Sequence, residues 1–207
     1  MKNHKFLKIT KIILAVFWYF QLALITAIIL IGLFLFLDVE FIDLNYLNGF
    51  QISFSKITFA ETLIYDGVNY DFTLTNGNGR LHIDDFQQKF VYLKMLAALV
   101  DSFIYLMIIY FLRKIFKNLT ENRYFISANG LYIKKIAYSI IFLSFVPQLI
   151  QYLTDYWIIN TIELRSISIK NEFDFGYQTV ILGLLVFVIS IVFLRGIELK
   201  EDKDLTI

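Results

Sequence analysis

The chain has 207 residues, of which 58% are hydrophobic and 18% are charged, and its formal net charge is +1. Soluble domains carry roughly 45–50% apolar and about 25% charged residues, so this composition excludes an ordinary soluble domain. The near-zero net charge argues against direct binding of nucleic acid, and the absence of cysteine excludes disulfides and thiol chemistry.

Four segments are predicted to cross a membrane, because each comes close to or exceeds the roughly 20 mostly apolar residues that a spanning helix needs. The segments cover residues 12–37, 91–112, 136–158 and 178–194. Four lysines precede the first segment: Lys2, Lys5, Lys8 and Lys11. Such a basic start resembles a signal peptide, but the apolar run exceeds the roughly 7–15 residues of a signal sequence, and no small-residue cleavage site follows. We therefore predict an uncleaved anchor and an all-α membrane protein, a bundle of four transmembrane helices forming a single domain over residues 1–207.

Charges are divided unevenly among the connecting segments. Residues 113–135, between the second and third spans, contain six basic side chains and one acidic side chain. Residues 38–89, between the first and second spans, contain eight acidic and three basic side chains. Because Lys and Arg concentrate on the cytoplasmic side of membrane proteins, we predict a multi-pass protein of the cytoplasmic membrane. Both termini and residues 113–135 are expected in the cytoplasm.

The two segments predicted outside, residues 38–89 and 159–177, have the patterns of short strands. Residues 50–57 alternate apolar and polar side chains, the period of a half-buried strand. Residues 68–74 and 80–83 flank the sequence Thr-Asn-Gly-Asn-Gly, which predicts a hairpin turn. The alternation returns in residues 162–170. Since an isolated hairpin is barely stable in water, we predict that both segments join in a small antiparallel β cap. The cap either senses a ligand or partner, or is a packed lid without a ligand.

No metal or cofactor site is predicted in the cap. His82, Asp84 and Asp85 lie close together in the sequence, but one histidine beside two acids at a strand end is usually solvated surface. The glycine-rich residues 76–79 lack the following Lys-Ser/Thr and the helix of a phosphate-binding loop.

Polar residues inside the second and third spans follow two stripes with matching spacing. One stripe is Lys94, Ala98, Asp101 and Tyr105, and the other is Ser144, Gln148, Gln151 and Asp155. In antiparallel helices joined by residues 113–135, these residues pair in reverse order, Lys94 with Asp155 and Asp101 with Gln148. An ionisable group at mid-membrane is costly and suggests function by default. This polar seam either holds the helices together by hydrogen bonds, with Asp101 protonated, or forms a proton or ion path.

The cytoplasmic segments contain a turn, a helix start and a charged tail. Ser127 is predicted to cap the helix that leads into the third span. The tail ends in an apolar tip, residues 205–207. This tip is expected either to pack on the loop around Tyr124 and Phe125 or to present a docking site to a soluble partner.

Two stretches resemble a known bacterial family. Residues 124–129, Tyr-Phe-Ile-Ser-Ala-Asn, precede a basic helix start, and Arg195-Gly leads to a tail that ends Asp-Leu-Thr-Ile. Both are similar to elements of the four-span membrane family filed as domain of unknown function 2975 (DUF2975). The loop departs at Tyr124, where proline is common, and at Ser127, where the hydroxyl is shifted by one position. Members are often encoded beside a small helix-turn-helix regulator, so the resemblance implies a membrane partner for a transcription factor and no catalytic activity.

The favoured hypothesis is therefore a membrane-bound regulator or sensor that docks a small cytoplasmic helix-turn-helix partner. The residues proposed for docking are Tyr124, Phe125, Asn129, Lys134, Lys135, Asp204, Leu205, Thr206 and Ile207. The alternative is a small transporter or channel that uses the polar seam. An enzyme is not expected, because neither of the two histidines lies near a spanning carboxylate or a nucleophile motif.

Overall fold

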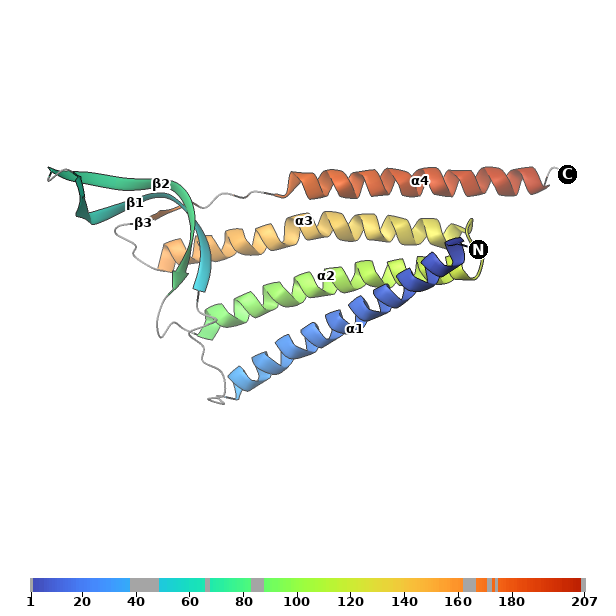
Figure 1. The fold of residues 1–207 in the computed structure, drawn as a ribbon, viewed down its shortest axis with the longest axis horizontal. Helices are drawn as coiled ribbons and strands as arrows, with labels where there is room; N and C mark the ends of the chain where they lie inside the picture. Colours follow the sequence, from blue (N-terminus) through green and yellow to red (C-terminus); the bar gives the residue numbers. More distant parts are fainter. Residues whose placement is uncertain are drawn as a thin grey trace. The chain divides into compact units, whose positions relative to one another are not determined.

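The computed structural model describes residues 2–37, 49–65, 68–82, 88–161, 167–170, 173 and 175–205. Over these residues the chain forms four α-helices and three β-strands (Figure 1). The elements are α1 (Lys2–Phe36), β1 (Gly49–Tyr65), β2 (Val68–His82), α2 (Gln88–Thr120), α3 (Ser127–Thr161), β3 (Ile167–Ile169) and α4 (Tyr177–Leu205). The predicted class, a mostly helical protein with a small antiparallel sheet, is confirmed.

All four helices are long and apolar enough to cross a membrane, over residues 6–36, 91–120, 127–161 and 177–203. Large apolar side chains point outward along them, including Phe20 (60% exposed), Phe142 (65%) and Val192 (66%). Apolar surface of this kind is unfavourable in water, by roughly 25 cal/mol per Å², whereas hydrocarbon removes the penalty. Helices also satisfy their backbone hydrogen bonds internally, as a span must.

The chain divides into two compact units. The helical unit contains Met1–Leu33, Leu96–Pro147 and Phe175–Ile207, and the sheet unit contains Phe34–Met95 and Gln148–Asp174. The predicted organisation as one membrane domain over the whole chain stays a prediction.

Within the helical unit, neighbouring helices in the sequence contact one another. Gln21 of α1 donates a hydrogen bond from Nε2 to the carbonyl oxygen of Ser102 in α2, at 3.2 Å. The rings of Phe111 in α2 and Tyr132 in α3 stack with their centroids 5.9 Å apart. The chain therefore places α1 beside α2 and α2 beside α3.

Small residues let α3 and α4 approach closely. A Cβ atom added to Gly183 of α4 would lie 2.6 Å from Cγ1 of Ile141 and 3.3 Å from the carbonyl oxygen of Ala137, both in α3. Ala137 and Ser190 are completely buried. Small residues at buried positions are typical of helix pairs in membranes, where close backbone approach improves van der Waals packing.

The four helices alternate in direction. Lys11, near the start of α1, and Lys117, near the end of α2, line the same groove. Phe125, just before α3, stacks on Phe193 in the second half of α4. The start of α1, the α2–α3 turn and the later part of α4 thus lie at one end of the helical unit, which we call the turn end (Figure 1).

The sheet unit contains a three-stranded antiparallel sheet in the order β2-β1-β3. The long hairpin pairs Gly49 with His82 at one end and Tyr65 with Val68 at the other, with a register shift between Thr58 and Thr62. β3 pairs with β1 over Ile167–Ile169. The prediction that the two connecting segments share one sheet is confirmed.

The predicted position of the hairpin turn is wrong. Residues 75–79 lie inside β2, where Gly77 pairs with Phe54 of β1. The buried Phe54 ring covers Gly77 so closely that a Cβ atom there would lie 2.4 Å from the ring Cζ. The glycine therefore leaves room for an aromatic ring rather than reversing the chain. In the sequence, residues 66–67 between the two strands are Asp-Gly, a pair favoured in two-residue hairpin connections.

Candidate functional site at the α2–α3 turn

The α2–α3 turn closes the end of α2 with a Schellman motif. Asn122 has a positive φ of 60°. The N–H of Arg123 donates to the carbonyl oxygen of Asn118 at 2.9 Å, and the N–H of Asn122 donates to that of Leu119 at 3.2 Å. These bonds satisfy two carbonyl groups that a helix end leaves without partners. Asparagine adopts the left-handed conformation more readily than most residues, so the sequence fits the turn.

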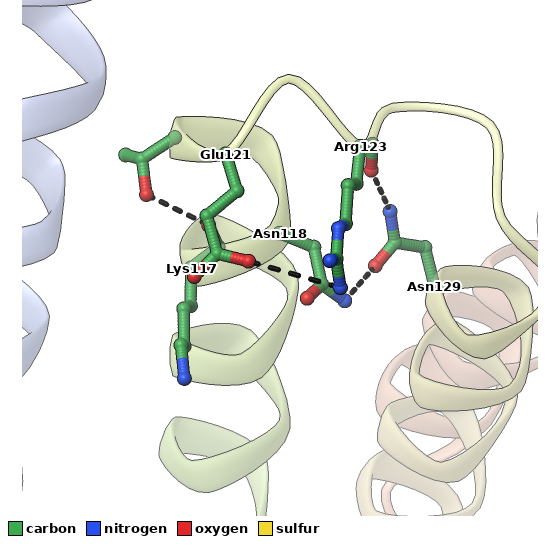
Figure 2. Close-up of polar contacts among 6 residues, drawn as sticks. Lys117, Asn118, Glu121, Arg123 and Asn129 are labelled. Carbon is green, nitrogen blue, oxygen red and sulfur yellow. Dashed lines mark hydrogen bonds and ion pairs between the residues drawn. The ribbon is translucent and has the colours of Figure 1, made fainter.

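Asn129 fastens the start of α3 to this turn. Its side chain is only 2% exposed. Its Nδ2 donates to the carbonyl oxygens of Arg123 and Tyr124, each at 3.0 Å. Its Oδ1 accepts from Nδ2 of Asn118 at 2.7 Å, and Figure 2 shows this bond together with the one to Arg123. A buried amide with partners for both its donors and its acceptor fixes the turn in one shape. Because Asn129 is buried, its predicted part in docking can only be indirect, through the shape of the turn.

The predicted cap at Ser127 is not formed in the expected way. Ser127 is the first residue of α3, but its hydroxyl is exposed and has no hydrogen bond within the described residues. The N–H of Asn129 instead donates to the carbonyl oxygen of Ile126 at 3.0 Å. The buried Asn129 side chain, which the sequence did not single out for this purpose, ties down the turn.

An aromatic patch lies on the outside of this turn, and consists of Tyr124, Phe125 and Phe193. Phe125 is 65% exposed and Tyr124 is 44% exposed. The Phe125 ring stacks on the half-buried Phe193 ring of α4, with centroids 5.9 Å apart and an interplanar angle of 19°. The Tyr124 hydroxyl donates to Oδ1 of Asn122 at 3.2 Å. The patch is thus an exposed apolar surface on a backbone with satisfied polar groups.

The two lysines predicted for docking lie over aromatic rings of neighbouring helices. Nζ of Lys134 is 5.6 Å from the ring centroid of Phe187 in α4. Nζ of Lys135 is 5.3 Å from the ring centroid of Phe111 in α2. Cation–π contacts at partly exposed sites contribute about 0.5–1 kcal/mol, so both lysines support helix packing at the turn end.

The tail continues as helix α4 to Leu205. Nη1 of Arg195 and Oε2 of Glu198 form an exposed ion pair at 2.8 Å on successive turns. The side chains of Asp204 and Leu205, and the whole of Thr206 and Ile207, lie outside the described residues. The predicted packing or docking of the apolar tip therefore stays a prediction.

Three residues of the predicted polar seam lie in the helical unit. Asp101 is half-buried, and its Oδ1 has no hydrogen-bond partner among the described residues. Ser144 is buried, and its hydroxyl donates to the carbonyl oxygen of Ile141 in its own helix at 2.6 Å. Tyr105 is 48% exposed, and within the described part no hydrogen bond joins it to Ser144.

The remaining seam residues belong to the sheet unit. Asp155 is buried and Gln148 is half-buried. The side chains of Lys94 and Gln151 lie outside the described residues. The pairings of Lys94 with Asp155 and of Asp101 with Gln148 stay predictions.

The candidate metal cluster of the sequence falls largely outside what the structure describes. His82 ends β2, but its side chain, like Asp84 and Asp85, is not among the described residues. Within the described ranges, no group of three His, Cys, Asp or Glu side chains could hold a metal ion.

Four helices that are long and apolar enough to cross a membrane, together with a small antiparallel sheet, are the features of a multi-span membrane protein. The family described as "Protein of unknown function (DUF2975)" matches residues 82–207, which is more than half of the chain. The protein belongs to this family. The match includes both the Tyr124–Asn129 stretch and the tail. No curated protein and no solved structure matches the chain.

Proposed function

We propose that this protein is a regulator or sensor in the cytoplasmic membrane that docks a small soluble partner at the aromatic patch. The turn end would face the cytoplasm, with both chain termini on that side. We expect no catalytic activity and no direct contact with nucleic acid.

The distribution of basic residues supports this orientation. Among the described residues at the turn end are Lys8 and Lys11 of α1, Arg113, Lys114 and Lys117 of α2, and Lys134 and Lys135 of α3. The strands β1 and β2 carry Glu61 and Asp71 beside only Lys56 and Arg80. A positive end and a near-neutral sheet favour the turn end as the cytoplasmic one.

The aromatic patch is the observation that carries the docking proposal. Exposed aromatic rings are enriched at protein interfaces and often dominate their binding energy. The Schellman motif and Asn129 hold the backbone below the patch in one shape, and such preorganisation lowers the cost of association. The family resemblance supplies the kind of partner, a small helix-turn-helix regulator.

The test is to co-express the protein with a small helix-turn-helix regulator of the kind that the family resemblance implies, and to measure how much regulator stays with the membrane. Truncating a central aromatic residue typically costs at least about 2 kcal/mol, so Phe125→Ala should weaken retention by about 30-fold in dissociation constant. Phe142→Ala is the matched control, because Phe142 is also 65% exposed but lies in the middle of α3. Retention that is unchanged in Phe125→Ala, or equally reduced in both variants, would contradict docking at the patch.

A small transporter or channel is a second candidate, supported by the buried Oδ1 of Asp101 without a partner among the described residues. A carboxyl group in a spanning helix is costly and commonly marks an ion or proton path. In vesicles containing the purified protein, Asp101→Asn should abolish a proton or ion flux if this function holds. Absence of any flux in the unmodified protein would eliminate it.

A further inference from the structure

A basic groove lies between α1 and α2 at the turn end. It has a volume of about 280 Å³ and is lined by Lys11 and Trp18 from α1 and by Tyr110, Arg113, Lys114 and Lys117 from α2. Ala15 also faces it, and its small side chain leaves room between the helices. All of these residues belong to the helical unit.

The four cations of the groove have no acidic partner within the described residues. No acidic side chain lines the groove, and the nearest acid in the sequence, Glu121, is 3.9 Å from Arg123. Like charges gathered in one groove repel one another. An anion seated between them would relieve this repulsion, so the groove is built for negative charge.

Two aromatic rings hold two of the cations in place. Cζ of Arg113 lies 4.9 Å from the ring centroid of Trp18, and Nζ of Lys114 lies 5.4 Å from that of Tyr110. The two rings are themselves 6.0 Å apart. Cation–π contacts restrict the charged groups without neutralising them, which leaves their N–H donors available to a ligand.

The groove lies where both helices change from charged to apolar sequence. Lys11 is the last charged residue before the apolar run of α1, and Arg113 is the first charged residue after residues 102–112 of α2. Tryptophan and tyrosine favour this level, where lipid headgroups meet the hydrocarbon. Apolar side chains remain exposed on α1 just beyond it, including Phe17 and Phe20. A ligand with an anionic head and apolar tails matches this arrangement, in which a basic groove is followed along the helix by exposed apolar side chains.

We propose that the groove binds the headgroup of an anionic phospholipid. The volume is near the lower end of small-molecule sites, which run from roughly 300 to 1,000 Å³, and suits a headgroup whose acyl chains stay in the bilayer. The guanidinium of Arg113 would contact phosphate oxygens in a two-pronged arrangement, with the lysines adding point charges. Basic pockets between spanning helices are suited to such headgroups. This site is separate from the aromatic patch and does not depend on the docking proposal.

Tryptophan fluorescence can test the proposal directly, because the chain has only two tryptophans. In the full-length Trp157→Phe variant, Trp18 is the sole tryptophan, and its emission is excited selectively at wavelengths that tyrosine does not absorb. The protein is placed in phosphatidylcholine nanodiscs that contain a small fraction of a brominated lipid. This lipid is either phosphatidylglycerol or phosphatidylcholine, and in both cases it is brominated near the glycerol end of its chains. Quenching is normalised to discs of the same composition without bromine. We expect several-fold more quenching by the anionic lipid than by the neutral one at equal fraction.

Charge variants separate a built site from general attraction to a basic surface. Arg113→Gln should remove the excess quenching, whereas Lys134→Gln should keep it, because Lys134 lies over Phe187 between α3 and α4. Arg113→Lys should restore only part of it, since lysine lacks the fork of donors. No excess quenching, or equal loss in Arg113→Gln and Lys134→Gln, would overturn the proposal. If inorganic phosphate at constant ionic strength abolishes the excess, the groove takes a free anion and the lipid assignment is wrong.

Discussion

The α2–α3 turn and the α1–α2 groove lie at the same end of the helical unit but differ in whether their polar groups have partners. In the turn, the buried Asn129 amide has a partner for each donor and for its acceptor. In the groove, Arg113 and three lysines have no acidic partner within the described residues. Satisfied polar groups fix a shape, whereas neighbouring like charges without counter-charges repel one another and attract an anion. The comparison separates residues that build this end from residues that are available to a ligand.

The largest effect is expected for Asn129→Ala. The substitution removes three hydrogen bonds and leaves the Asn118 side chain and two carbonyl oxygens without these partners. Each buried unsatisfied polar group costs about 1–3 kcal/mol, so we expect a loss of about 2–4 kcal/mol, measured by thermal unfolding in mild detergent. Ser127→Ala is the control, and should change stability by less than about 0.5 kcal/mol. Equal melting temperatures of Asn129→Ala and Ser127→Ala would mean that the hydrogen bonds of Asn129 do not stabilise the turn. The contrast between a turn with satisfied polar groups and a groove of neighbouring positive charges would then fail.

A smaller effect is expected at Asn122, whose φ is 60°. A β-branched side chain there costs about 1–2 kcal/mol, whereas glycine accepts this conformation without strain. Asn122→Val should therefore unfold at a lower temperature, and Asn122→Gly should remain close to the unmodified protein. Matching losses in both variants would mean that the Asn122 side chain, rather than the backbone conformation, stabilises the turn.

The smallest effect is expected at Lys117 in the groove. Lys117→Gln removes one of four neighbouring positive charges, so in neutral detergent its stability should be equal to or up to about 0.5 kcal/mol above that of the unmodified protein. The gain should disappear in high salt, because salt screens repulsion between exposed charges. A clear loss of stability at low salt would show that Lys117 has a stabilising partner.

The helices could be predicted from the sequence because a spanning helix is a local property of about 20 consecutive residues. It could also be predicted that both connecting segments belong to one sheet, because each segment alternates apolar and polar side chains. The position of the hairpin turn could not be predicted, because Asn76–Gly79 is a strong local turn signal, whereas in the structure Gly77 lies inside β2 and pairs with Phe54, whose ring covers it. Asp66-Gly67, which separates the two strands in the sequence, is a shorter signal of the same kind.

The residues of the candidate site could be found from the sequence, but their roles only in part. Tyr124 and Phe125 are exposed as the docking hypothesis requires. Asn129 belongs to the same short stretch, yet it is buried, because its amide completes a turn that involves Asn118 eleven residues earlier. The groove was missed because Lys11 and Arg113 are far apart in the sequence and meet only when α1 packs on α2. In the sequence, the basic residues of the groove indicated only the orientation of the protein in the membrane.

The proposed orientation has the turn end in the cytoplasm and the sheet outside. Because the chain has no cysteine, single cysteines can be placed at Glu121 in the turn and at Thr75 in β2, both of which are exposed. A membrane-impermeant maleimide added to intact cells should label Thr75→Cys and leave Glu121→Cys unlabelled until the membrane is permeabilised. Labelling of Glu121→Cys in intact cells, with protection of Thr75→Cys, would contradict the proposed orientation and with it the cytoplasmic docking site.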